Sequence, residues 1–527
     1  MPLYLGLDSS TQSLTAIVLD VSGSRREVVF ERSLSFDERF PRYGTRHGVL
    51  PSEDPLVAEA PPLMWAEALD EMMGVVARES GLNLSRLSAI SGSAQQHGSV
   101  YVGTAAAEIF AALDPNRPLV GQLAGAFSRA RSPIWLDSST SSQCAAIERT
   151  VGGAAALATL TGSRAFERFT GPQIRKFFEQ DPEGYERTRR IHLVSSFLAS
   201  LLAGRHAPIE PGDGAGMNLM DIARGEWAPA ALAATAPRLA GTLPPVASSW
   251  TVAGPLAPYW VTRYGFPPAK VVVWSGDNPC SLIGVGVTRP GRIAISLGTS
   301  DTLFGYLAEP RADPSGAGHV FGAPTGDWMS LVCFKNGSLA RERVRDAHGL
   351  DWRGFARALD ATPPGNGGAI MLPWFEPEIT PPVLAPGVRR FGLDQDDGPA
   401  NVRAVVEGQM LAMKRHSRWM GAAVDRIHAT GGAAANRAIL QVMADVFGAD
   451  VVSLETGNSA CLGAALRAYH ADEVSEGREI GWDEVVAGFT APSAAGRVTP
   501  RSDAVDVYRE LEKVYAAREA EALRAQV

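Results

Sequence analysis

Lysine is scarce in this chain, and its positions exclude the most common nucleotide-binding loop. The 527 residues include only five lysines, none of which follows a glycine-rich loop in P-loop spacing: Lys176, Lys270, Lys335, Lys414 and Lys513. The Val-Ala-Ile-Lys, His-Arg-Asp and Asp-Phe-Gly strings of protein kinases are also absent. P-loop NTPases and protein kinases are therefore excluded. A dinucleotide-binding Rossmann site gains little support, because Gly431-Gly432-Ala433 is not a G-x-G-x-x-G string.

Cysteine, long apolar runs and positive charge are also in short supply. The four cysteines are too scattered for a disulfide framework or a zinc site, and no apolar run is long enough to span a bilayer. The N-terminus has no basic start of the kind that opens a secretory signal. A net charge of -8 provides no basic field for nucleic acid or an anionic membrane. We expect a cytoplasmic protein, monomeric or homodimeric, that binds small molecules and neither nucleic acid nor membrane.

The chain is long enough for two large domains, and its composition is that of an ordinary globular protein. Hydrophobic residues make up 45% and charged residues 20% of the sequence. Strand-like and helix-like segments alternate in both halves, which predicts an α/β architecture. We place the domain boundary near residue 285, giving segments 1–285 and 286–527.

A pattern occurs twice, at residues 3–18 and again at residues 292–304. Each copy has an apolar strand, a short Ser/Thr-rich turn and a second apolar strand. Such turns present backbone N–H groups and hydroxyls without bulky side chains, so they can approach phosphate oxygens. The repeat predicts two related halves and two hairpins able to grip one nucleotide between them. Taken singly, each turn is explained as well by turn formation alone.

Further elements follow from periodicity and breakers. Trp65, Leu69, Met72 and Val76 have helical spacing and predict a helix with a core-facing stripe. We also predict strands at 87–91, 270–274, 427–430 and 450–454, helices at 191–202, 401–424 and 502–524, a helix bearing Ile439, Val442, Met443 and Val446, and loops with short helices over 208–255.

Asp277 follows one of the predicted buried strands and precedes a predicted helix. Ligands of open α/β sheets gather at such strand ends. A helix N-cap is the simpler interpretation of this residue alone. In the same way, Asp8 alone fits a turn, His97 a core histidine, Arg168 a surface ion pair and Trp352 a core aromatic residue.

Five longer strings carry a specific resemblance to a known family. They are SGSAQQHGSVY at 91–101, WLDSST at 135–140, RAFERFTG at 164–171, CFKNGSL at 333–339 and NSAC at 458–461. With the two hairpins and Thr430-Gly431-Gly432, the chain from about residue 3 to residue 470 resembles the FGGY carbohydrate kinases. The resemblance implies a two-lobed actin-like ATPase, ribonuclease H-like sugar kinase fold with an interdomain cleft. Residues 1–285 would form the sugar-binding and catalytic lobe, and 286–527 the nucleotide-binding lobe with its C-terminal helix.

The resemblance also implies roles for individual residues. Asp277 is the expected general base, and Asp8 and Asp277 are the expected Mg²⁺ ligands. The sugar would be bound by His97, Arg168, Asp277 and Asn278. ATP would be bound by Ser10, Thr11, Gln12, Gly298, Thr299, Ser300, Trp352, Gly432, Ala433 and Asn436. Asp137-Ser138-Ser139 departs from the Arg-containing string of many relatives, which argues against sugar contact there.

The implied activity is ATP-dependent phosphorylation of D-xylulose to D-xylulose 5-phosphate. Ribulose, fuculose, fructose and glycerol are alternative substrates, because the nucleotide half is shared within the family. A different class is an actin- or Hsp70-like protein in which ATP drives partner binding, and a third alternative is a pseudokinase that only binds its ligands. The presence of both Asp8 and Asp277 argues against loss of catalysis.

Overall fold

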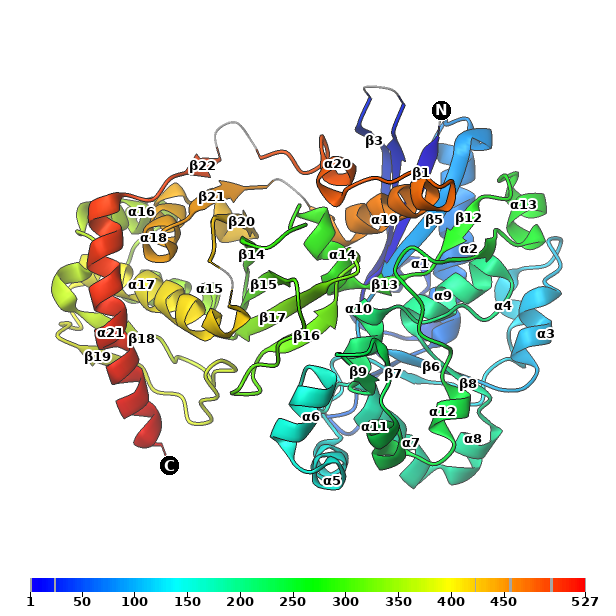
Figure 1. The fold of residues 1–527 in the computed structure, drawn as a ribbon, viewed down its shortest axis with the longest axis horizontal. Coiled ribbons are helices and arrows are strands. Elements are labelled where there is room, and N and C mark those ends of the chain that lie inside the picture. Colours follow the sequence, from blue (N-terminus) through cyan, green and yellow to red (C-terminus); the bar gives the residue numbers. More distant parts are fainter. Residues whose placement is uncertain (1, 23–24, 422, 455–456, 493–495, 527) are drawn as a thin grey trace. The chain divides into compact units, whose positions relative to one another are not determined.

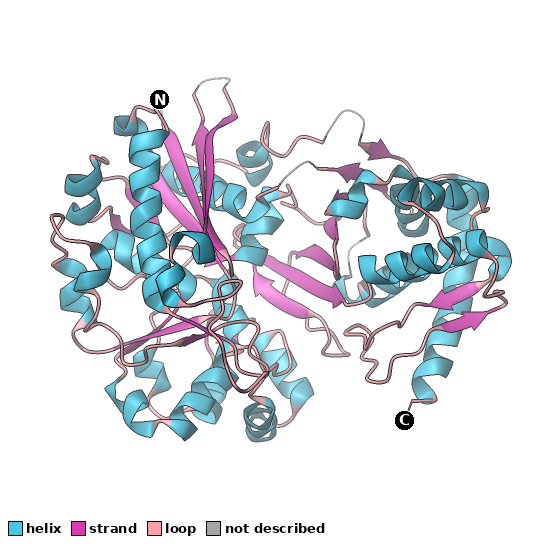
Figure 2. Ribbon diagram, turned by 180° about the vertical axis from the view of Figure 1, so that it is seen from behind, coloured by secondary structure: helices cyan, strands magenta, loops and turns pink. Residues whose placement is uncertain are grey.

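Two sheets with the same strand order organise the chain, one in each of two compact units. The computed structural model describes residues 2–22, 25–421, 423–454, 457–492 and 496–526 (Figures 1 and 2). The first unit comprises residues 1–286, 320–328 and 457–490, and the second comprises 287–319, 329–456 and 491–527. Each unit is built from three separate stretches of the chain, whereas the predicted segments 1–285 and 286–527 were continuous. The difference lies in residues 320–328 and 457–490, which belong with the first unit.

The sheet of the first unit has mixed strand directions. Its order is β3 (Glu27–Ser35), β2 (Ser13–Asp20), β1 (Leu3–Ser9), β5 (Leu87–Ala94), β12 (Lys270–Val272) and β11 (Val252–Pro255), with β13 (Ser275–Gly276) also beside β5. The first three strands are antiparallel, whereas β1, β5 and β12 run parallel to one another. The carboxyl ends of the three parallel strands therefore lie at one edge.

The second sheet repeats this order. After β16 (His319–Gly322) at one edge, it runs β17 (Trp328–Phe334), β15 (Asp301–Leu307), β14 (Arg292–Leu297), β20 (Arg426–Thr430), β21 (Asp450–Ser453) and β22 (Arg497–Val498). Strand β14 pairs antiparallel with β15 and parallel with β20, as β1 does with β2 and β5. The prediction of two related halves, each opening on a hairpin, is confirmed.

The side chains of β1 alternate between the two faces of the sheet, and each face packs against a different helix. Leu3, Leu5 and Leu7 belong to a core cluster with residues of α2 (Pro62–Glu79), whereas Tyr4 belongs to a cluster with residues of α19 (Ser459–Ser475). Successive side chains of a strand point to opposite faces, so one strand serves both layers. The four apolar residues of the predicted 65–76 stripe are buried in α2, as expected.

Glycines allow α19 to pack unusually close to its neighbours. A methyl group at Gly6 of β1 would lie 2.4 Å from the carbonyl oxygen of Cys461, and one at Gly463 would lie 1.9 Å from that of Cys280 in α14 (Asp277–Gly284). A methyl group at Gly284 would likewise lie 1.9 Å from the carbonyl oxygen of Ser459. Backbone therefore meets backbone along this helix pair, which only residues without a Cβ permit.

The first unit also contains shorter strands and further helices, some of which form a core cluster of their own. They are α1 (Phe36–Arg39), η1 (Pro41–Tyr43), β4 (Glu59–Ala60), η2 (Leu84–Arg86), β6 (Ser99–Val102), α3 (Ala106–Ala111), α4 (Leu119–Gln122), β7 (Ser132–Pro133), α5 (Ser141–Val151), α6 (Ala154–Thr161), α7 (Thr170–Gln180), α8 (Pro182–Arg187), β8 (Arg190–Leu193), α9 (Val194–Ala203), α10 (Pro211–Gly214), η3 (Ala215–Met217), β9 (Met220–Asp221), β10 (Glu226–Trp227), α11 (Pro229–Thr235), α12 (Leu239–Thr242), α13 (Pro258–Tyr264) and α20 (Trp482–Val486).

Helices also cover the second sheet. The remaining elements there are α15 (Ser338–Ala347), α16 (Trp352–Ala361), η4 (Asn366–Gly368), β18 (Ile370–Leu372), β19 (Arg389–Phe391), α17 (Gly398–His416), η5 (Arg418–Met420), η6 (Gly432–Ala435), α18 (Arg437–Phe447) and α21 (Ser502–Arg524). The chain passes from the second unit to the first within β16 (His319–Gly322). Tyr508 and Tyr515 of α21, the helix predicted at 502–524, are fully buried. Among the described residues, no helix combines the length and apolarity that a bilayer crossing demands.

Several predicted boundaries were wrong. Residues 191–193 form the end of strand β8, and the helix begins only at Val194. The helix predicted to reach residue 424 ends at His416, the last of three consecutive basic residues in its final turn. Strand β5 extends beyond residue 91 to Ala94, and β12 ends at Val272.

We expect Gly463→Ala to destabilise the first unit, since the new methyl group would meet the backbone at Cys280. Overpacking of this kind costs about 1–3 kcal/mol, more than the ~1 kcal/mol by which alanine improves helix propensity. Gly241→Ala is the matched control, because a methyl group there has no neighbour within 4 Å. Guanidinium unfolding measures both; a wild-type midpoint for Gly463→Ala would contradict the close packing.

Candidate active site

Two carboxylates lie where parallel strands of the first unit end. Asp8 is near the end of β1, and Asp277 is the first residue of α14, directly after β13. Ser93 of β5 is the register partner of both Asp8 and Ser275. The two strand ends that carry the aspartates therefore flank the same point of β5, as the sequence order predicted for ligand-binding residues.

Burial raises the pKa of both carboxyl groups, so that each is harder to ionise than an ordinary aspartate. Burial raises the pKa of Asp277 to about 7, and the negative charge of Asp8 contributes to this rise. Burial also raises the pKa of Asp8 to about 6, against the effect of the neighbouring Ser93 hydroxyl. The Oδ1 atom of Asp8 is buried and has no hydrogen-bond partner among the described residues. A cation between the two carboxylates would relieve this unfavourable arrangement.

The conformation of Asp277 argues against a capping role. The N-cap of α14 is Gly276, so Asp277 lies inside the helix. Its Oδ1 accepts hydrogen bonds from the backbone N–H of Asn278 at 2.8 Å and from the Asn278 side chain at 3.0 Å. The interpretation of Asp277 as a helix N-cap is therefore wrong.

His97 is held in a single orientation as a neutral imidazole. Its Nδ1 lies 2.7 Å from the carbonyl oxygen of Gly216, which only accepts, so Nδ1 carries the proton and Nε2 is left as an acceptor. Burial and the nearby charge of Arg168 lower the pKa of His97 to about 3. Its backbone has a φ of 71°, a strained conformation for a non-glycine residue.

Arg168 comes from the loop before α7, and its guanidinium group packs over aromatic rings. It lies 5.0 Å from the ring centre of Phe166 and 5.5 Å from that of Phe169. Phe169 in turn contacts the His97 ring, with 4.5 Å between centroids. The structure thus brings His97 and Arg168 together through this aromatic residue, as was expected of residues that bind one ligand.

Gln96 joins the two segments that carry the other predicted residues, although it was not among the predicted residues. Its Oε1 accepts a hydrogen bond from the Asn278 side chain at 2.6 Å, and its Nε2 donates to the Gly212 carbonyl oxygen at 3.2 Å. The position directly before His97 at a strand end was the available sequence signal.

The β1–β2 turn contains Ser10, Thr11 and Gln12. Ser10 closes the turn through its own hydrogen bonds to Ser13, and the Gln12 side chain is exposed. The Thr11 hydroxyl accepts a hydrogen bond from the indole N–H of Trp135 at 2.8 Å, which leaves its own proton available for a ligand. Trp135 is 42% exposed despite its size, and it too was missed as a site residue.

The second unit contains a cavity of about 820 Å³ beside the β14–β15 turn. Six predicted ATP-binding residues line it: Gly298, Thr299, Trp352, Gly432, Ala433 and Asn436. Ser300, the seventh from this unit, is exposed and does not line it. Glu342, Arg353 and Asp360 also line the cavity, on α15 and α16, and sequence analysis did not identify them. Arg353 and Asp360 are exposed and Glu342 is half-buried, and as single charged residues on helices they carried no distinguishing pattern.

The walls of this cavity are fixed by local hydrogen bonds. The Asn436 side chain caps α18 by accepting from the N–H groups of Ala438 and Ile439, so its carbonyl oxygen already has partners. Its amide group is the part left to bind a ligand. The Gly298 carbonyl oxygen accepts from the Ser338 N–H at 2.8 Å. Trp352 is 41% exposed. The guanidinium carbon of Arg345 lies over its ring, 4.5 Å from the ring centre.

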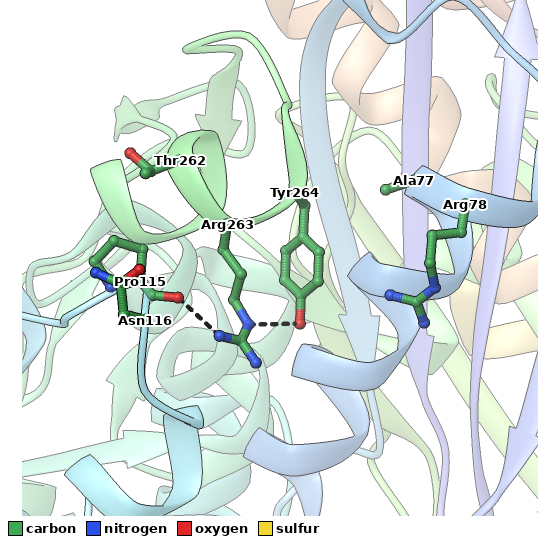
Figure 3. Close-up of a pocket in the computed structure, with 7 residues that line it drawn as sticks. All are labelled: Ala77, Arg78, Pro115, Asn116, Thr262, Arg263 and Tyr264. Carbon is green, nitrogen blue, oxygen red and sulfur yellow. Dashed lines mark hydrogen bonds between the residues drawn. The ribbon is translucent and has the colours of Figure 1, made fainter.

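Another cavity lies in the first unit, and none of the predicted site residues lines it. It measures about 610 Å³ and lies beside α2 and α13 (Figure 3). Arg263 within it donates to the Pro115 carbonyl oxygen at 2.7 Å and to the Tyr264 hydroxyl at 3.1 Å. Its most prominent charged side chain is thus already engaged.

Comparison with known proteins places this geometry in a family. The N-terminal domain model of the FGGY family of carbohydrate kinases matches residues 130–284, and the C-terminal domain model matches 293–471. Over 527 residues the chain is 44% identical to xylulose kinase of Mus musculus, covering 98% of this chain and 93% of the mouse protein. Over 493 residues it is 45% identical to xylulose kinase 2 of Arabidopsis thaliana, covering 89% and 87%.

A solved structure shows the same fold. The crystal structure of xylulose kinase from Rhodospirillum rubrum superposes with a TM-score of 0.83 at 20% identity, covering 99% of each chain. The predicted fold, the α/β actin-like ATPase fold of the sugar kinases, is confirmed. The fold and the two matched domains define a carbohydrate kinase. The chain belongs to the FGGY family of carbohydrate kinases.

We expect Asp8→Asn to stabilise the protein at neutral and alkaline pH. The folded-state pKa of Asp8, about 6, lies above the ordinary value of 3.8, so ionisation opposes folding. This cost is absent below about pH 4 and complete above about pH 7. Its removal should raise the free energy of unfolding at pH 8 by about 1–3 kcal/mol and leave it unchanged at pH 4.

Urea unfolding at both pH values measures the effect. Asp54→Asn, in an exposed loop of the same unit, is the control and should change neither value. A destabilised Asp8→Asn variant at pH 8 would show that the Asp8 carboxylate is held by favourable interactions.

Proposed function

We propose that this protein transfers the γ-phosphoryl group of ATP to the primary hydroxyl of D-xylulose, giving D-xylulose 5-phosphate and ADP. The observation that carries the proposal is the grouping of Asp277, Asn278, His97 and Arg168 around the strand ends of one unit. The names of the relatives that align along nearly the whole chain support this choice of sugar.

The polar groups suit recognition of a polyol. A sugar presents several hydroxyls, each a donor and an acceptor, so a specific site needs both kinds of partner in fixed positions. Nε2 of neutral His97 is an acceptor, and the Arg168 guanidinium group is a donor. Their common contact with Phe169 restrains both groups.

Asp277 is the proposed general base. Its carboxylate accepts the proton of the sugar hydroxyl while that oxygen forms a bond to the γ-phosphorus and the bond to the β-phosphate oxygen breaks, releasing ADP. A raised pKa of about 7 makes the carboxylate a better proton acceptor than an ordinary aspartate at neutral pH.

Magnesium fits the carboxylate pair. Asp8 and Asp277 would hold the ion, and the unpartnered buried oxygen of Asp8 is the observation that favours it. Bound Mg²⁺ would neutralise phosphate charge. The described residues include no group of three or more His, Cys, Asp or Glu side chains arranged for a metal, so further ligands would be water or phosphate oxygens.

The nucleotide is assigned to the cavity of the second unit. Trp352 and the backbone at Gly432 and Ala433 offer a surface for the adenosine, and the Asn436 amide offers hydrogen bonds. Gly298 and Thr299 are the proposed phosphate contacts at the other wall. Ser10, Thr11 and Gln12 remain proposed phosphate contacts in the first unit, and Ser300 in the second.

Asp277→Asn tests the assignment of the base. We expect kcat to fall by about 10²- to 10⁴-fold, because the amide cannot accept the proton, while D-xylulose affinity changes little. A coupled ADP-release assay over D-xylulose, ribulose, fuculose, fructose and glycerol measures turnover and substrate choice together, with Asp54→Asn as the control. Undiminished turnover by Asp277→Asn would refute its role, and preference for another substrate would refute the choice of D-xylulose.

Trp352→Ala tests the nucleotide cavity. Stacking of a base on an aromatic ring is worth about 1–3 kcal/mol, so the Kd for ATP should rise roughly tenfold or more. Trp352→Phe retains a ring and should lie close to wild type. Calorimetric titration with ATP gives the Kd values; equal affinities in all three proteins would place the adenine elsewhere.

A further inference from the structure

A buried carboxylate lies behind the segment that leads to Asp277. Glu210, the residue before α10, is fully buried and accepts hydrogen bonds from the N–H groups of Gly212 and Asp213, both at 2.9 Å. It also accepts from the hydroxyl of Ser249 at 2.8 Å and from that of Ser275. Four donors are thus directed at the two carboxylate oxygens, two at each.

A buried cation reaches the same segment from α19. Arg467 is 1% exposed, and its guanidinium group donates to the carbonyl oxygens of Ser249 and Val273 at 3.0 Å each and to that of Gly92 at 3.2 Å. Arginine suits this task because its planar group offers several donors in fixed directions. Close packing of α19 at Gly463 and Gly6 brings the side chain within reach of these strand ends.

The two charged groups bind the same two stretches of chain. Ser249 gives its hydroxyl to Glu210 and receives the Arg467 guanidinium at its carbonyl oxygen. Residues 273–275 are bound in the same way, Val273 by Arg467 and Ser275 by Glu210. Asp277 follows two residues after Ser275. The segment 273–275, directly before Asp277, is therefore held in place by hydrogen bonds to both charged groups.

We propose that Glu210 and Arg467 are positioning residues that fix Asp277 for proton transfer. The proposal rests on the proposed function of Asp277 as the base. Burying charged groups is costly unless hydrogen bonds compensate for the lost water. The Glu210 carboxylate has four donors, both terminal nitrogens of Arg467 are hydrogen-bonded while its Nε has no partner among the described residues, and bonds from both side chains converge on the segment before Asp277. Misplacement of a catalytic group by about 1 Å can cost roughly 100-fold in rate, which gives such fixation its value.

Glu210 also supports the sugar residues. By binding the N–H groups of Gly212 and Asp213 it orders the 211–217 segment. Carbonyl oxygens of that segment hold Gln96, through Gly212, and His97, through Gly216. Loss of the Glu210 carboxylate should therefore disturb sugar affinity as well as catalysis, whereas loss of the Ser275 hydroxyl should disturb catalysis alone.

Ser275→Ala and Glu210→Gln, alone and combined, test the proposal. For Ser275→Ala we expect kcat, counted per molecule able to bind ATP, to fall about tenfold or more with the KM for D-xylulose within about twofold. For Glu210→Gln we expect a lower kcat together with a higher KM. Because Ser275 acts through its hydrogen bond to Glu210, the double variant should have the kcat of Glu210→Gln.

Asp472→Asn is the matched control, since Asp472 is also a buried charged residue of α19. It binds Tyr4 and Lys270, away from residues 273–277. It should lower the unfolding temperature and leave kcat unchanged. The same behaviour in Ser275→Ala, a lower unfolding temperature with wild-type kcat, would show a merely structural role and overturn the proposal.

A second readout separates failure of this proposal from failure of the proposed function. The carboxyl ¹³C resonance of Asp277, assigned with Asp277→Asn, should move in Ser275→Ala and stay in place in Asp472→Asn. If the wild-type protein phosphorylates no sugar while this resonance moves, the proposed function fails and the fastening of Asp277 stands. An active wild-type protein whose kcat and resonance are both unaffected by Ser275→Ala overturns the positioning role.

Discussion

The contact of α19 with β1 and α14 is the constraint on which the first unit depends. Gly6, Gly284 and Gly463 let backbone approach backbone where a methyl group would lie within about 2.5 Å of a carbonyl oxygen. The helix comes from residues 459–475, far along the chain, yet it covers one face of the N-terminal sheet. The same close approach carries Arg467 beneath the strand ends. Packing and catalytic geometry therefore have a common origin.

The strand ends concentrate negative charge that a fold selected for stability alone would avoid. Asp8 and Asp277 are both buried enough for their pKa values to rise, and the charge of Asp8 makes ionisation of Asp277 less favourable still. The neighbouring charged groups hold the chain around these aspartates in place, and they do not pair with the carboxylate of Asp277. Glu210 and Arg467 bind the backbone and hydroxyls next to Asp277, and its carboxylate remains available for a ligand. A site of this kind is stable only on a rigid support.

Sequence patterns predicted the elements whose faces differ in polarity. The stripe of α2 and the repeated hairpins were found because one face is apolar or because the turn residues are distinctive. The start of α9 was missed because all of its residues are buried, which leaves no periodicity to mark a boundary with β8. The end of α17 did carry a signal, the basic residues Lys414, Arg415 and His416 that favour a helix C-terminus.

The candidate site divides in the same way. Asp277 and His97 lie at strand ends, and the sequence singled them out because their motifs follow one another in the same order as in the FGGY carbohydrate kinases. Glu210 and Arg467 could not be predicted, because their roles depend on hydrogen bonds between segments 39 to 375 residues apart in the sequence. Ser300 was assigned to the nucleotide with its neighbours, but it does not line the cavity that they line. Local sequence cannot distinguish adjacent residues of an exposed turn.

Phosphorus NMR of the reaction tests the central claim most directly. Purified protein is mixed with magnesium, ATP and D-xylulose labelled with ¹³C at C5, and the phosphorus products are observed. The account predicts a phosphate monoester whose phosphorus couples to the labelled carbon, formed together with an equal amount of ADP. Release of inorganic phosphate alone, or the absence of any phosphorylated sugar, would contradict it.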